Sequence, residues 1–155
     1  MTYAAKTTVA FEKSVSEIVM LIKRAGAKQI GQMDDADFFA IQFVIVDRMI
    51  RFRLPLPKLA EMPTHDGRGF SLNPKQRIDK LDQTKRQRGR ALRLVINAKL
   101  ESVESGIETL EQAFLAHVVM ADGKTIYDRI SSGIALEYQT GRPNAVAGLL
   151  AGPSA

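Results

Sequence analysis

The sequence contains no cysteine, and none of its apolar runs is long enough to cross a membrane. The lack of cysteine excludes disulfides, thiolate metal sites and cysteine nucleophiles, and it is compatible with a reducing compartment. A membrane-spanning helix needs about 20 consecutive apolar residues, and a secretory signal needs a basic stretch before an apolar core. The sequence has neither feature, so we expect a soluble protein of the cytoplasm.

Motifs of common enzyme active sites are also missing. The chain has no glycine-rich phosphate loop, no nucleophile elbow and no paired-acid nuclease motif. His65 lies in a polar loop without a second metal ligand at a usual spacing, whereas His117 is expected to be a buried histidine bonded to backbone. Three acids in one turn can bind a divalent cation but are more often solvated: Asp34, Asp35 and Asp37. The sequence therefore assigns no catalytic residue, cofactor or metal ligand.

Length and composition indicate one folded domain. The chain has 155 residues, of which 45% are hydrophobic and 25% charged, so it can bury one core. We expect an α+β domain at 1–145 and a small apolar tail at 146–155. The α+β class is predicted because a group of strands is flanked by helices instead of alternating with them.

The N-terminal region predicts a strand followed by a helix. Thr7–Phe11 is short and β-branched, which is typical of a strand. Ser14–Glu17 has the spacing of a capping box, so the helix is expected to begin there and to end at Gly26. Apolar residues at steps of three and four predict a core-facing side made of Val15, Ile18, Val19, Ile22 and Ala25.

A β-hairpin is predicted next, after a short strand at Lys28–Met33. Its strands are Phe38–Val46 and Met49–Leu56, joined by a turn at Asp47–Arg48. The second strand alternates between an apolar face and a face with two arginines, Arg51 and Arg53. Four phenylalanines of the hairpin are expected in the core, with a base-stacking platform as the alternative: Phe38, Phe39, Phe43 and Phe52.

The positive charge of the chain is concentrated in residues 74–100. This segment holds nine Lys and Arg and two Asp, a balance of +7 (9 − 2), while the rest holds 13 basic and 15 acidic residues, or −2 (13 − 15). A localised positive field attracts polyanions, so DNA or RNA is the first partner to consider. The proposed phosphate contacts are Lys85, Arg86, Arg88, Arg90 and Arg93, with Arg51 and Arg53 on the hairpin; a solvated helix start is the alternative.

The C-terminal half is expected to be mainly helical. After a long surface loop or lid at 57–73, a helix begins at Pro74, and Gly89 and Gly106 are points where it can bend or split. It carries an apolar stripe: Leu92, Ile96, Leu100, Val103, Ile107, Leu110 and Phe114. A final helix is predicted at Thr125–Thr140.

The segment RQRGRALRLVINAKLESVESGIETLEQAFLAHVVMADGKTI, residues 86–126, resembles a family of small, uncharacterised bacteriophage and prophage proteins. That family combines a basic stretch, an LVIxAKLE helix, a GIET turn and FLAH before a DG turn. The resemblance covers the C-terminal half well and implies a phage-encoded protein in the host cytoplasm, without implying an activity. Gly89 stands where the family usually has an aromatic residue.

Two functional hypotheses follow from the sequence. In the first, the protein is a non-catalytic phage accessory factor that binds nucleic acid through the basic helix and serves DNA metabolism or regulation. In the second, it is an interaction module that inhibits or recruits a host protein through its amphipathic helix or apolar tail. A homodimer is an open alternative, because a long helix with an apolar stripe can pair with its copy.

Overall fold

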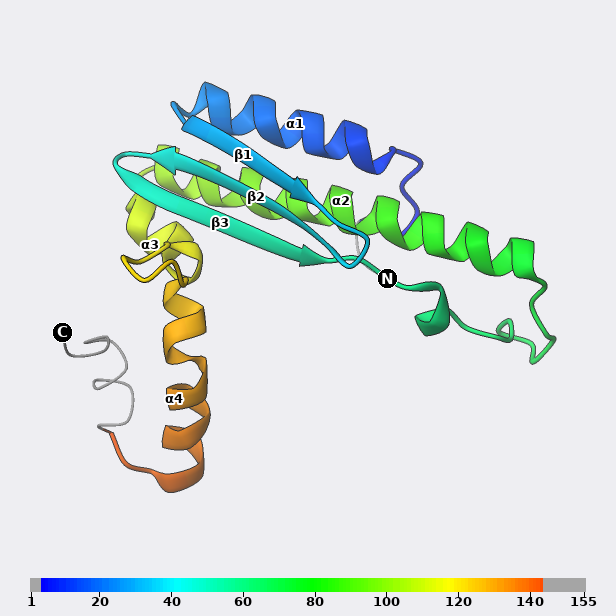
Figure 1. Cartoon of the computed structure of the whole chain (residues 1–155). Coiled ribbons are helices and arrows are strands. Elements are labelled where there is room, and N and C mark those ends of the chain that lie inside the picture. The colour runs from blue at the N-terminus through cyan, green and yellow to red at the C-terminus, as the bar shows by residue number, and fades with distance from the viewer. Residues whose placement is uncertain (1–3, 144–155) are drawn as a thin grey trace.

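The computed structural model describes residues 4–143, which form an α+β fold (Figure 1). Three antiparallel strands in the order β1-β2-β3 follow the first helix, and a long helix and several shorter helices come after the sheet. The elements are α1 (Phe11–Arg24), β1 (Lys28–Asp34), β2 (Phe38–Ile45), β3 (Arg48–Pro55), η1 (Leu59–Glu61), α2 (Pro74–Glu104), α3 (Leu110–Phe114), η2 (Leu115–His117) and α4 (Ile126–Thr140). The predicted α+β class and hairpin are confirmed, while the expected tail at 146–155 lies outside the described residues.

The sheet has one face against the helices and one open face. In β2, Phe39, Ile41, Phe43 and Ile45 are buried and join a core with residues of α1 and α2. The residues between them are only half-buried, as period-2 alternation requires. The β2–β3 turn falls at Val46 and Asp47, one residue earlier than predicted, and both have positive φ, 48° and 58°. A turn with two left-handed residues matches the twist of a hairpin.

Two predictions for the N-terminal region are wrong. Residues 7–10 form no strand, and α1 begins at Phe11 after Ala10, which provides no side-chain cap. The predicted capping residue Ser14 lies inside the helix and is fully buried. Its Cβ would lie 3.3 Å from a Cβ built on Gly89, so Ser14 is a small contact residue between α1 and α2. The core side of α1 is confirmed except at Ala25, which is exposed beyond the helix end.

The long helix α2 spans 31 residues and splits from α3 at Gly106. Asn73 caps its start, with its side chain accepting from the Gln76 N–H at 2.8 Å. Gly106 has a φ of +74°, a conformation that glycine adopts most readily, and it ends the helix. The predicted stripe is therefore divided: Leu92 and Ile96 are buried on α2, whereas Ile107 is exposed in the connection.

The segment that follows η2 closes the core and the edge of the sheet. Val118 forms an isolated bridge with Ile50, and the Val119 N–H donates to the Met49 carbonyl at 2.8 Å, so this segment covers the outer edge of β3. The predicted final helix is confirmed as α4, with Thr125 as its cap. No helix among residues 4–143 is long and apolar enough to cross a membrane.

Candidate nucleic-acid interface

The first half of α2 carries six basic side chains without acidic partners. We call this set the basic half of α2: Lys75, Arg77, Lys80, Lys85, Arg86 and Arg88. Within residues 4–143, none of them forms an ion pair. Figure 1 shows that the first turns of α2 extend past the sheet and past α1, where the 57–73 segment runs beside them. The concentration of positive charge is therefore preserved on the folded surface.

The hydrogen-bond acceptors of the three arginines of the basic half of α2 are all neutral within the part of the chain that the structure describes. Arg77 donates to the Leu59 carbonyl at 2.9 Å, Arg86 donates to the Gln83 amide oxygen at 2.8 and 3.2 Å, and Arg88 donates to the Pro55 carbonyl. These bonds fix the side chains without neutralising their charges. Among the lysines, Lys75 and Lys80 are exposed and Lys85 is half-buried.

Arg90 and Arg93, which the sequence also suggested as phosphate contacts, instead meet α1. The Glu17 carboxylate lies 2.6 Å from Arg90 Nη2 and 3.3 Å from Arg93 Nε. The Arg90 side chain is only 14% exposed. One carboxylate thus holds two guanidinium groups between the helices, and these two arginines are less accessible to a ligand than the lysines.

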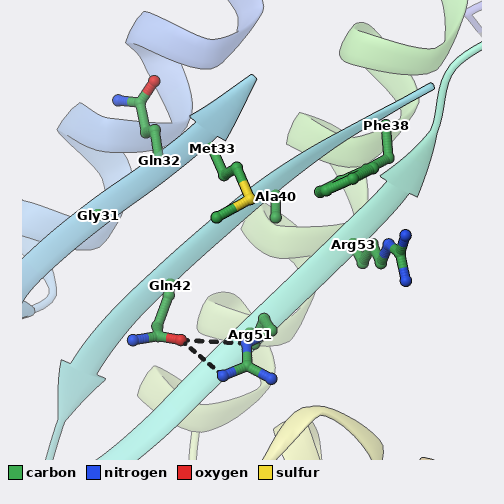
Figure 2. A pocket seen from close by; sticks show the side chains of 8 residues that line it. All are labelled: Gly31, Gln32, Met33, Phe38, Ala40, Gln42, Arg51 and Arg53. Atoms are coloured by element: carbon green, nitrogen blue, oxygen red, sulfur yellow. Dashed lines mark hydrogen bonds between the residues drawn. The ribbon is translucent and has the colours of Figure 1, made fainter. Parts of the chain in front are cut away.

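Arg51 and Arg53 lie on the open face of the sheet, away from the helices. Figure 2 shows Arg51 beside Gln42, whose amide oxygen accepts from Arg51 Nε and Nη2 at 3.0 and 2.9 Å; Arg51 Nη1 donates to the Gly123 carbonyl at 2.8 Å. The Arg53 guanidinium lies 4.2 Å from the centre of the Phe38 ring. Both arginines line a shallow groove of about 460 Å³. The seven candidate residues are consequently distributed over two faces of the molecule.

Three of the four hairpin phenylalanines belong to the core, as predicted. Phe39, Phe43 and Phe52 are buried, and the last two meet Phe114 edge-on. The prediction is wrong for Phe38, which is half-buried on the open face beneath Arg53. The reason is the strict alternation of β2, which sends residues 38 and 39 to opposite faces.

Neither histidine belongs to a group of potential metal ligands within residues 4–143. His65 Nδ1 lies 2.9 Å from the Thr64 hydroxyl in an exposed loop. His117 is half-buried and stacks on the Phe52 ring with centroids 4.0 Å apart. Among the three acids of the predicted turn, Asp37 forms an ion pair with Lys58, with 3.2 Å between Oδ1 and Nζ. Residues 4–143 contain no group of three or more potential His, Cys, Asp or Glu ligands for a metal ion.

The environment of His117 predicts a pH-dependent stability. Burial, followed by the charge of Lys99, lowers the pKa of His117 below 6.5, and a hydrogen bond with the Arg51 backbone opposes this shift. At pH values between the lowered pKa and 6.5, the unfolded chain binds more protons than the folded protein. The free energy of unfolding is therefore greatest above this pH range and decreases as the pH falls through it. Thermal unfolding measured at about pH 7.5 and at about pH 5 should show that His117→Gln loses less stability on acidification than the unmodified protein does.

His65→Gln is the matched control for this measurement, because it removes the other histidine from an exposed position. It should retain the pH dependence of the unmodified protein. If the unmodified protein and His117→Gln lose equal stability on acidification, the pH dependence does not come from His117.

Sequence reasoning missed two groups of the site. Glu17 is separated from Arg90 by 73 positions, and no local pattern links them. Lys75, Arg77 and Lys80 lie in the predicted basic segment but are not among the predicted phosphate contacts. Comparisons with protein-family models, with curated proteins and with solved structures find no match to this chain.

Proposed function

We propose that this protein binds nucleic acid through the phosphate backbone, using the basic half of α2. The observation that supports this is the set of six cations between residues 75 and 88, none of which is ion-paired within the described residues. Fourteen helical residues span about 20 Å, and at about 100° per residue the six cations lie on several sides of the helix, where they form a basic collar that phosphates can approach. Each phosphate that a cation neutralises releases counterions and adds to the affinity.

The division between fixed and exposed cations suggests how this surface works. Arg86 and Arg88 hold their positions through neutral acceptors and contribute a preorganised positive field. Lys75 and Lys80 are exposed and free to follow the phosphates. Contacts to phosphate position a strand without reading its sequence. We therefore propose a non-catalytic accessory role in DNA metabolism or regulation, in the phage context that the family resemblance implies.

Replacing three lysines of this surface should weaken binding strongly. The variant Lys75→Gln/Lys80→Gln/Lys85→Gln removes three charges, and Gln preserves helix propensity. Since each phosphate contact contributes several-fold at low salt, affinity for a labelled oligonucleotide should fall at least about tenfold at about 50 mM salt, measured by fluorescence anisotropy.

A matched control removes the same charge elsewhere. Lys23, Lys28 and Lys124 are exposed and form no ion pair in the part of the chain that the structure describes. Changing these three to Gln should alter binding much less than changing Lys75, Lys80 and Lys85. Equal losses in the two variants would mean that net charge, and not this surface, determines binding.

For the alternative function, recruitment or inhibition of a host protein, the surfaces predicted from the sequence are the apolar stripe of the amphipathic helix and the apolar tail. Leu92 and Ile96 of the apolar stripe are buried in the core, so a partner or a second copy that used them would compete with folding. The tail at 146–155 lies outside the described residues. Absence of oligonucleotide binding at about 50 mM salt would favour a protein partner over nucleic acid.

A further inference from the structure

The segment 57–73, predicted as a long surface loop or lid, contains an ordered hairpin at residues 64–72. The Leu72 N–H donates to the Thr64 carbonyl at 2.8 Å, and the Asp66 N–H donates to the Phe70 carbonyl at 2.8 Å. His65 and Ser71 pair as an isolated antiparallel bridge. We call this the 64–72 hairpin. Its backbone bonds give it a defined shape even though it lies outside the core.

The tip of the 64–72 hairpin is fixed by one aspartate. Asp66 Oδ1 accepts from the N–H groups of Arg68 and Phe70 at 2.9 and 3.0 Å. The Gly69 N–H also donates to the Asp66 carbonyl at 3.0 Å. These bonds define the backbone positions from which the side chains of residues 68 and 70 project.

Both side chains at this tip are exposed. The Phe70 residue is 66% exposed, and the Arg68 side chain is 83% exposed. The Arg68 guanidinium lies 5.7 Å from the centre of the Phe70 ring, and its Nη2 lies 3.8 Å from Asp66 Oδ2. An aromatic ring on an ordered turn that stays out of the core contributes little to folding. It therefore offers an aromatic face and a nearby cation to a ligand.

The segments on both sides of the 64–72 hairpin are connected to the basic half of α2. Before it, Arg77 of α2 donates to the Leu59 carbonyl, and the Thr84 hydroxyl lies 3.8 Å from Met62 Sδ. After it, Asn73 caps α2 two residues before Lys75. The hairpin is thus connected at both ends to the helix whose first half carries the cations without an ion pair among the described residues.

We infer that the 64–72 hairpin binds a base of a single-stranded nucleic acid, with Phe70 as the stacking surface, while the backbone of the strand follows the basic half of α2. This inference rests on the proposed function and specifies its ligand. In a duplex the faces of the bases are covered by their neighbours, whereas a single strand exposes them to aromatic side chains. Arg68 adds a cation next to the stacked base.

Two oligonucleotides separate stacking from backbone contact. A single-stranded oligothymidylate of about 16 nucleotides provides bases and phosphates, and an abasic strand of the same length provides phosphates alone. Phe70→Ala should weaken binding to oligothymidylate by about five-fold to about 150-fold and leave binding to the abasic strand unchanged. Tyr138→Ala is the control, since Tyr138 is the most exposed aromatic residue described and lies on α4.

A second variant gives a direct optical signal, because the chain contains no tryptophan. Phe70→Trp should retain binding, and its fluorescence should be quenched by oligothymidylate but not by the abasic strand. Tyr138→Trp should be quenched by neither.

The possible outcomes are distinguishable. If the unmodified protein binds both strands but Phe70→Ala changes neither affinity, the stacking inference is overturned and the proposed function stands. A loss of equal size on the two strands also overturns it. If the unmodified protein binds neither single strand at about 50 mM salt, the inference fails, whereas the proposed function fails only if a duplex of the same length is not bound either.

Discussion

Replacing Phe114 by alanine is expected to lower the free energy of unfolding by about 3–5 kcal/mol, the range for a large aromatic residue removed from a core. Phe114 is fully buried at the end of α3. Its ring meets Phe43 and Phe52 edge-on at 6.3 and 6.1 Å, and Lys99 Nζ of α2 lies 5.9 Å from its centre. The ring therefore joins the sheet to both α2 and α3, and its loss leaves a cavity where three elements meet.

Denaturant unfolding followed by circular dichroism measures this effect. Leu115→Ala is the matched control, because the neighbouring Leu115 is 51% exposed. This substitution should lower the free energy of unfolding by less than about 1 kcal/mol. Comparable losses in the two variants would contradict the packing described for α3.

Replacing Gly89 by leucine is expected to destabilise the protein by about 3 kcal/mol or more. A Cβ at position 89 would lie 2.8 Å from the Phe11 ring and 3.3 Å from Ser14 Cβ, both on α1. A leucine must therefore force α1 away from α2, and it would disturb the edge-on contact between Phe11 and Phe39. In this chain Phe11 occupies the space that a side chain at position 89 would enter.

Two comparisons test the cause of this loss. Ala98→Leu adds a similar side chain on the exposed side of α2 and should change stability by about 0.5 kcal/mol at most. Gly89→Ala should be better tolerated in a Phe11→Ala background than in the unmodified protein, because the closest contact is then removed and alanine favours the helix by about 1 kcal/mol. Equal effects of Gly89→Ala in both backgrounds would show that Phe11 is not the obstacle.

The parts of the fold that were predictable are those governed by local patterns. Aromatic and β-branched residues in 38–46 and alternation in 49–56 predicted the hairpin, which the structure places at 38–45 and 48–55, and the left-handed conformation of Gly106 agrees with a split suggested by glycine alone. The start of α1 was wrong because Ser14 matches a capping box locally, while its burial depends on Gly89, which is 75 positions away in the sequence (89 − 14). A pattern within four residues contains no information about such a contact.

The candidate site was predictable in its charge and not in its arrangement. The excess of Lys and Arg in residues 74–100 is a property of composition, but the pairing of Arg90 and Arg93 with Glu17 depends on how α1 packs. Likewise, alternation placed Arg51 and Arg53 on one face of β3, and only the fold shows that this face points away from α2. Phe70 was not predictable as a candidate residue from the sequence, because a loop without periodicity gives no indication of an ordered hairpin.

The salt dependence of oligonucleotide binding tests the central proposal most directly. Anisotropy titrations between about 50 and about 200 mM salt give the slope of log affinity against log salt, which falls by about 0.7 for each phosphate contacted on a single strand. We expect a slope of about −2 to −4 for the unmodified protein, and a slope shallower by about 2 for the variant with Gln at 75, 80 and 85. No binding at about 50 mM, or the same slope for both proteins, would contradict binding through the basic half of α2.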